Sequence, residues 1–284
     1  MLRKLSILGP GLLGGSIGLA VRHRQVARSV SVWARRPEAA DQAWKLGAAD
    51  EAGTDLARAV ADAELVVLAT PIGAMCGLAE QIRPLLAPGC VVTDVGSVKY
   101  PVVTAVRHAL EDRVRFVGSH PMAGSEQAGI EAARRDLFEN AVCIVTPQDD
   151  TDRAALQMVH DFWKALGCSV RTLSPQAHDE IAARVSHLPH LVAAALVNVV
   201  CHDGEQALQF VGPGFRDATR IAGGPADLWT EIAVENRQEI GRALERLIEE
   251  LAKIRQALEN ADAVELRSML KRAKHLRDEL RFRS

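Results

Sequence analysis

Two short polar loops in this chain carry side chains that could move a proton. The segment GSHPMAGSEQAG (118–129) holds His120 between two serines, and VTDVGSVK (92–99) places Ser97 directly after an apolar run. A serine hydroxyl can hydrogen-bond one nitrogen of an imidazole while the other nitrogen exchanges a proton with a substrate. We therefore expect His120 to be an acid–base group that Ser97 orients. The alternative is that His120 only braces its loop.

These two loops can meet only if they follow neighbouring strands of one sheet. Over residues 1–173, short β-branched runs alternate with amphipathic helical stretches, which predicts a mostly parallel, doubly wound sheet with helices on its faces. Ligands bind beyond the carboxyl ends of the strands in such sheets. The loop LATPIG follows the fourth predicted strand and brings Thr70 and Pro71 to the same edge.

A glycine-rich loop opens the chain. ILGPGLLGGSIG follows the first predicted strand, and its Gly9, Gly11 and Gly14, with Leu12 and Leu13 between them, form the pattern GxGxxG. Between a strand and a helix, this pattern is typical of a dinucleotide-binding loop. The first glycine allows a tight turn, the second lets the backbone approach a pyrophosphate, and the third lets helix and strand pack closely. A glycine-rich turn without a ligand is the alternative.

The end of the second predicted strand bears on the choice of cofactor. An acidic residue there usually binds the adenosine ribose of NAD, but this chain reads VWARRPE, with Ala34 at that position followed by Arg35 and Arg36. Guanidinium groups would bind a 2′-phosphate that an acid would repel. We predict that NADP is preferred and that NAD remains possible. The alternative is a solvated arginine pair before Pro37.

The pattern changes near Ser174, after which no strand is predicted. Residues 175–202 are expected to form one long helix, kinked at Pro189, whose apolar second half is buried. A stripe from Ile240 to Leu258 recurs at spacings of four and three, which predicts a long amphipathic helix.

Two domains are therefore expected. An α/β dinucleotide-binding domain of the modified Rossmann type spans residues 1–173, and an all-α substrate and dimerisation domain spans 174–284. The surplus of apolar helical surface predicts a homodimer.

The composition narrows the class of protein. A net charge of −2 gives no reason to expect a nucleic-acid or membrane partner. The five cysteines are odd in number and never spaced as CxxC, so they indicate reduced residues in a cytoplasmic protein, without a metal site. The N-terminus has no signal-peptide pattern.

Six segments together resemble the prephenate/arogenate dehydrogenase family of tyrosine biosynthesis. They are GxGxxG, ATP, DVGSVK, GSHPMAGSE, SHLPH and GFRDATRIA. The resemblance implies a modified Rossmann domain followed by a helical dimerisation domain. It also implies oxidative decarboxylation of prephenate or arogenate with hydride transfer to NAD(P)+, giving 4-hydroxyphenylpyruvate or tyrosine.

The resemblance implies a role for each matching residue. His120 would contact the 4-hydroxyl of the substrate ring, Ser97 would orient His120, and Arg220 would bind a substrate carboxylate. One histidine of SHLPH, either His187 or His190, would lie near the substrate, although a histidine on an apolar helix is more often a satisfied core residue.

The resemblance also places Glu126 near the substrate's side chain.

Two other classes of function are alternatives. A β-hydroxyacid dehydrogenase would share the architecture but use a lysine of the helical domain, and none occurs between Lys164 and Lys253. A non-catalytic NADP sensor would have no need for His120 and Arg220.

Overall fold

The computed structural model describes residues 1–111, 114–125, 127–202 and 204–280. The chain forms two compact units, Met1–Arg237 and Gln238–Ser284. The first unit holds the sheet and the helices around it, and the second is helical.

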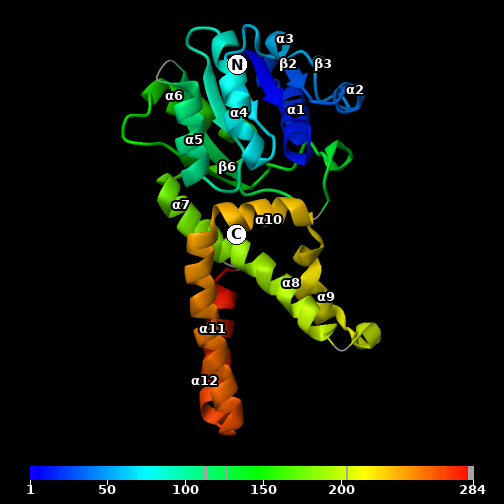
Figure 1. Cartoon of the computed structure of the whole chain (residues 1–284), viewed down its shortest axis with the longest axis vertical. Helices are drawn as coiled ribbons and strands as arrows, with labels where there is room; N and C mark the ends of the chain where they lie inside the picture. The colour runs from blue at the N-terminus through cyan, green and yellow to red at the C-terminus, as the bar shows by residue number, and fades with distance from the viewer. Residues whose placement is uncertain (112–113, 126, 203, 281–284) are drawn as a thin grey trace. The chain divides into compact units, whose positions relative to one another are not determined.

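One eight-stranded sheet forms the centre of the first unit, in the order β3-β2-β1-β4-β5-β6-β7-β8 (Figure 1). The strands are β1 (Leu2–Leu8), β2 (Ala27–Trp33), β3 (Glu51–Gly53), β4 (Leu65–Leu68), β5 (Val91–Asp94), β6 (Arg115–Pro121), β7 (Val142–Thr146) and β8 (Ser169–Thr172). Neighbouring strands are parallel except β6 and β7, which are antiparallel. The prediction of a mostly parallel, doubly wound sheet is confirmed.

Both faces of the sheet are buried at its centre, where β4 is apolar at every position and alternates its side chains between the faces. In β4, Leu65 and Val67 point into one hydrophobic cluster, and Val66 and Leu68 point into the other. Side chains of the helices that follow β1, β2 and β7 join the first cluster, and those of the helices that follow β3, β4 and β5 join the second.

The helices of the sheet-bearing part are α1 (Leu12–Arg24), α2 (Pro37–Lys45), α3 (Leu56–Val60), α4 (Ile72–Ile82), α5 (Tyr100–Leu110) and α6 (Arg153–Ala165). The later helices of the first unit are α7 (Pro175–Ala182), α8 (Leu188–Val200), α9 (Pro213–Thr219) and α10 (Ala226–Glu235).

The long helix expected after residue 174 is present. Ser174 caps it by accepting a hydrogen bond from the Ala177 N–H, and the helix continues to Val200 through α7, a π-helical turn at Ala183–His187, and α8. The irregular turn ends two residues before Pro189, which lacks an N–H and crowds the carbonyl one turn earlier.

The expected burial of the second half of this helix is wrong for a single chain. Within α8 the buried residues are His190 and Ala193, whereas Val199 is 72% exposed. Apolar composition predicts that a helix is covered but not whether its own chain covers it. By length and composition the helix Pro175–Val200 could also cross a membrane, a property that it shares with core helices of soluble proteins.

The second unit is a helical hairpin of α11 (Arg237–Glu259) and α12 (Ala263–Leu280) (Figure 1). Asp262 starts α12 by accepting hydrogen bonds from the N–H groups of Val264 and Glu265. The amphipathic helix predicted over 240–258 is therefore present, and several of its leucines are exposed in the single chain.

Candidate active site

The glycine loop has the geometry that a dinucleotide requires. Gly9 has a φ of +105°, and a Cβ on it would lie 2.7 Å from the Ala69 carbonyl oxygen. A Cβ on Gly14 would overlap the Gly9 carbonyl oxygen, whereas one on Gly11 would meet no described atom within 4 Å. The first and third glycines are thus needed for packing, and the second leaves an open approach to the backbone.

The start of α1 adds an electrostatic reason for phosphate to bind here. Gly11 is its N-cap, no side chain caps the helix, and its first turn, which includes Leu12 and Leu13, has no acid. The N–H groups and positive dipole end are therefore available to an anion. Beside this loop, Thr70 has a buried hydroxyl with no hydrogen-bond partner among the described residues. These features fit a bound dinucleotide.

The end of β2 carries no acid. Ala34 is buried, and the side chains of Arg35 and Arg36 are exposed. Trp33 anchors this end by donating its indole N–H to the Thr54 carbonyl oxygen at 3.0 Å. The two guanidinium groups are thus on the surface beyond the strand that normally supplies the ribose contact.

His120 lies near the end of β6 and is 7% exposed. Its Nδ1 is 2.8 Å from Nε2 of His178 in α7, 58 residues later. No hydrogen bond joins it to Ser97 within the described chain, so the expected Ser97–His120 bond is absent from this structure. Ser97 is half-buried in the loop after β5, and His178 makes the hydrogen bond to His120 that was expected from the Ser97 hydroxyl.

A carboxylate orients His178 in turn. Its Nδ1 is 2.8 Å from Oδ1 of Asp179, which also accepts the Lys99 N–H at 2.7 Å, while the other oxygen accepts the Tyr100 N–H at 2.8 Å. Both carboxylate oxygens of Asp179 therefore accept hydrogen bonds, and the backbone N–H groups at the start of α5 hold the carboxylate in place.

These bonds determine the tautomer of each neutral imidazole. His178 must carry hydrogen on Nδ1 to donate to Asp179, which leaves its Nε2 as an acceptor. His120 must then carry hydrogen on Nδ1, so its Nε2 is left with a lone pair. Residue pattern alone does not predict this relay, because His178, Asp179 and Glu180 at the start of a helix are also typical of a solvated turn.

The electrostatic surroundings keep His120 neutral. Burial holds its pKa well below the ordinary value of 6.5, and a second positive charge is disfavoured near Lys99 and near His178, which can itself be protonated. Burial also lowers the pKa of His178, although its hydrogen bond to Asp179 acts in the opposite direction. A neutral, buried imidazole at the same carboxyl edge of the sheet as the glycine loop is suited to take a proton.

A buried ion pair holds the backbone next to His120. The Lys99 ammonium pairs with Asp94, and both side chains are 0% exposed. The second oxygen of Asp94 accepts the N–H of Ser119, the residue before His120, at 3.1 Å. Lys99 therefore links the two sides of the site, through its ammonium to β5 and β6 and through its backbone N–H to Asp179.

The two histidines of SHLPH are both buried. His187 accepts a hydrogen bond on Nδ1 from the Asn236 amide at 3.1 Å, and its Nε2 has no partner among the described residues. His190 stacks on Trp229 with ring centroids 3.5 Å apart, and its Nδ1 likewise has no partner in the described chain. Burial lowers both pKa values, that of His187 to about 4. Of the two, His187 is close enough to His120 to affect its pKa.

Arg220, the predicted carboxylate ligand, lies in the helical part of the first unit. Arg220 begins the short 3₁₀ helix Arg220–Gly223, which packs against α8. The next residue, Gly224, approaches the stacked pair so closely that a Cβ would lie 2.6 Å from the Trp229 indole nitrogen and 3.2 Å from His190. Glu126 lies outside the described residues. The described residues include no cluster of three or more His, Cys, Asp or Glu that could hold a metal.

A dinucleotide loop and a buried, neutral imidazole at one edge of a mostly parallel sheet are typical of a nicotinamide-dependent dehydrogenase. Comparison with known proteins agrees. Residues 17–172 match the family "Prephenate dehydrogenase, nucleotide-binding domain" and residues 174–272 match "Prephenate dehydrogenase, dimerization domain". The chain belongs to the prephenate dehydrogenase family.

Individual relatives are similar over nearly the whole chain. The prephenate dehydrogenase of Bacillus subtilis is 36% identical over 98% of this chain and 76% of its own length. The cyclohexadienyl dehydrogenase of Zymomonas mobilis is 31% identical over 92% and 90%. The solved Aquifex aeolicus prephenate dehydrogenase, in complex with hydroxyphenyl propionate and NAD+, has a TM-score of 0.92 at 31% identity and covers 99% of both chains.

Proposed function

We propose that this chain catalyses the oxidative decarboxylation of prephenate or arogenate with NAD(P)+. The observation that carries the proposal is the lone pair of His120 Nε2, fixed by His178 and Asp179 in a chain of this family. Substrates of the relatives are named as prephenate and cyclohexadienyl compounds, and a solved arogenate dehydrogenase from Synechocystis has a TM-score of 0.83 at 30% identity.

The proposed mechanism begins with proton transfer to His120. The cofactor, which the glycine loop would hold, would supply the hydride acceptor for the carbon that bears the substrate's hydroxyl group. His120 Nε2 accepts the hydroxyl proton as the carbonyl forms. The His120 ring is then positively charged, and its Nδ1–H donates to His178. Asp179 stabilises that charge through His178. Loss of carbon dioxide aromatises the ring without needing a further protein group.

The substrate's carboxylates have three proposed partners. Arg220 would bind one by a charge-assisted bond, as a permanently charged guanidinium can. His187 and His190 would offer their unpartnered nitrogens, with His187 the closer to the base. Because a carboxylate contact made in ground and transition states alike is uniform binding, Arg220→Ala should chiefly raise KM.

Three further expectations are part of the proposal. NADP would be preferred over NAD through Arg35 and Arg36, although the A. aeolicus relative holds NAD+. Residues 1–173 would bind the cofactor and 174–284 the substrate and a second copy, which the meeting of the two family domains between 172 and 174 supports. The five unpaired cysteines suit a cytoplasmic location.

The direct test is the growth of reduced-nicotinamide absorbance with prephenate and with arogenate in parallel. We expect turnover with at least one of them and none with 3-hydroxyisobutyrate. Two 3-hydroxyisobutyrate dehydrogenases share the fold at 14% and 12% identity, which is evidence of fold alone. Turnover of that hydroxyacid without turnover of either cyclohexadienol would contradict the proposal.

A further inference from the structure

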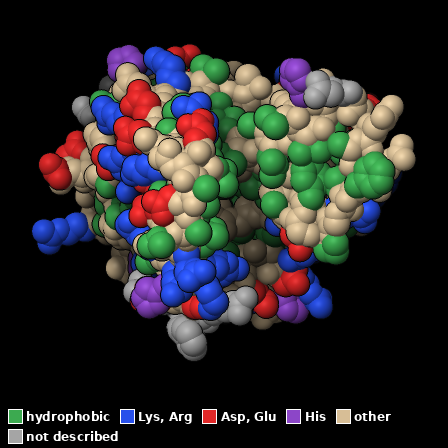
Figure 2. Space-filling model, turned by 90° about the horizontal axis from the view of Figure 1, so that it is seen from below, with side chains coloured by type: hydrophobic (Ala, Val, Ile, Leu, Met, Phe, Trp, Pro, Cys, Tyr) green, Lys and Arg blue, Asp and Glu red, His purple; other side chains and the backbone are tan. Residues whose placement is uncertain are grey.

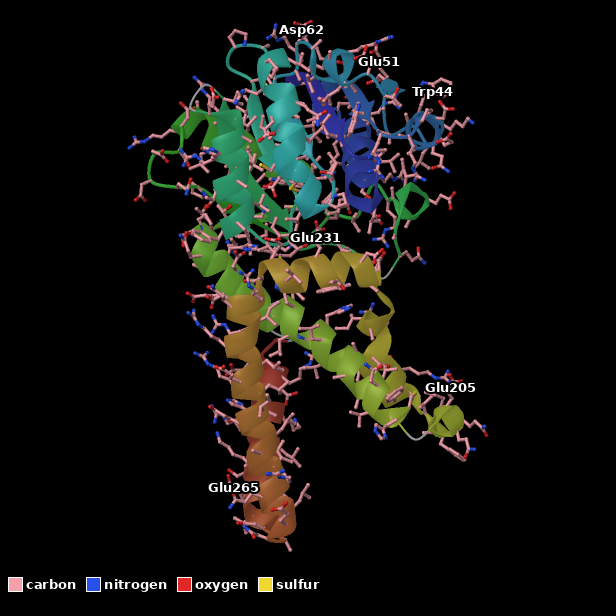
Figure 3. The ribbon with its side chains drawn as sticks, in the orientation of Figure 1. Trp44, Glu51, Asp62, Glu205, Glu231 and Glu265 are labelled. Atoms are coloured by element: carbon pink, nitrogen blue, oxygen red, sulfur yellow. The ribbon has the colours of Figure 1, made fainter. Side chains whose placement is uncertain are left out.

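Glu231 joins the helical part of the first unit to the cofactor loop. It lies in α10, where this helix meets the sheet-bearing part (Figure 3). One oxygen of its carboxylate accepts the Ile72 N–H at 3.2 Å and the other accepts the Gly73 N–H at 2.5 Å. These are the first two residues of α4, whose N-cap residue, Pro71, supplies no side-chain cap.

The negative charge of Glu231 strengthens its contact with the N-terminus of α4. A carboxylate at a helix N-terminus satisfies backbone N–H groups that have no partner in the helix and opposes the positive dipole end. Here it does so across 159 positions of sequence, from Ile72 to Glu231. A Cβ on Gly73 would lie 2.9 Å from the Glu231 oxygen, so the glycine makes room for it.

The loop that Glu231 holds is the one beside the dinucleotide site. Thr70 and Pro71 lie between β4 and α4, and Ala69 and Thr70 pack against Gly9 of the glycine loop. The position of the α4 N-terminus therefore sets one wall of the cofactor site.

The same helix also contacts the substrate side of the site. Two residues before Glu231, Trp229 stacks on His190. At the end of the helix, the Asn236 amide donates to the Asp179 carbonyl oxygen at 3.0 Å and to His187. Ile232, 2% exposed, packs in the same hydrophobic cluster as residues of α4.

We propose that Glu231 is a positioning residue that holds the α4 cofactor loop in register with the substrate histidines carried by α7 and α8. The proposal rests on the proposed function for the identity of the substrate, but not for its effect on cofactor binding. Loss of the carboxylate should loosen the cofactor loop while the relay from His120 to Asp179 stays intact.

The test measures the Kd of NADP+ by calorimetry and, separately, kcat and KM with prephenate. Glu231→Ala should raise the Kd of NADP+ about ten- to a hundredfold, as loss of charge-assisted bonds does. The acid limb of the pH–rate profile should not move, since the base is untouched. Glu235→Gln, an exposed acid of the same helix, is the matched control and should change neither value.

A second variant tests the contact from its other side. Gly73→Ala should weaken NADP+ binding in the wild type, by displacing the carboxylate, but not in the Glu231→Ala background. An unchanged Kd in folded Glu231→Ala, with only the melting temperature lowered, would reduce Glu231 to a structural role and overturn the proposal. A wild type that binds NADP+ but does not turn over either substrate would instead overturn the proposed function.

Discussion

Nδ1 of His120 lies 2.8 Å from Nε2 of His178, and this bond decides which nitrogen of His120 is left to act as a base. Asp179 fixes the hydrogen of His178, and His178 fixes the hydrogen of His120. The proton acceptor is thus set by a carboxylate two side chains away, on the helix that follows the sheet.

Removing the charge of Asp179 should disturb this order. Asp179→Asn can present an amide N–H where His178 needs an acceptor, which favours the wrong tautomer of both rings. We expect kcat to fall by up to about 10⁴-fold, as the same carboxylate-to-amide change does in the Ser-His-Asp triad. Single-turnover kinetics would measure it, with the exposed Asp149→Asn as control. A kcat within a few-fold of wild type would show that the relay does not set the tautomer.

The buried histidines should make both activity and stability sensitive to acid. The pKa of His120 is lowered, so the acid limb of kcat/KM should lie below pH 6.5, the ordinary value for a histidine. Stability depends on pH through His187, whose pKa is lowered to about 4 in the folded chain. As the pH falls, the unfolded chain binds a proton at this residue near pH 6.5, whereas the folded chain binds it only near pH 4.

The contribution of His187 to the free energy of unfolding should therefore be greatest above pH 6.5 and should fall as the pH drops from 6.5 through about 4. For His187 alone the loss is at most about 3 kcal/mol. Urea titrations between pH 4 and 7.5 would measure it, and His187→Asn should give a shallower slope. A slope unchanged by that substitution would contradict the assignment.

The cofactor preference depends on two exposed guanidinium groups. Arg35→Ala combined with Arg36→Ala should weaken NADP+ about ten- to a hundredfold and leave NAD+ nearly unchanged. Arg28→Ala, an exposed arginine within β2, is the control. Equal affinity of the wild type for both cofactors would show that the arginines are only a solvated pair.

Assembly should cover the apolar surface that a single chain leaves open. Figure 2 shows apolar side chains on the face seen from below. The exposed apolar residues of the chain include Val199 at 72% and Phe210 at 85%. We expect a homodimer with a large interface, of order 2,000 Å² or more in total. Light scattering at micromolar concentration should give twice the chain mass, and Val199→Asp should weaken the dimer. A wild-type monomer would contradict this.

The sequence predicted those parts of the molecule whose chemistry is local. The glycine loop has its spacing within six residues, and His120 is a polar residue at a strand end. The predicted partner of His120 was wrong, because His178 and Asp179 reach the site through the packing of α7 against α5 and β7, which the sequence does not show. The exposure of α8 was missed for a related reason: apolar composition does not distinguish burial within a chain from burial between chains.

The most direct test of the account is the kcat of His120→Asn with saturating prephenate and NADP+. Asparagine keeps some hydrogen bonding but cannot accept the proton, so kcat should fall about 10²–10⁴-fold. Cofactor affinity should stay within a few-fold, and Ser97→Ala should cost less, because Ser97 does not hold the base in this structure. If His120→Asn kept nearly full kcat, or retained the acid limb, His120 would only brace its loop and the mechanism would be wrong.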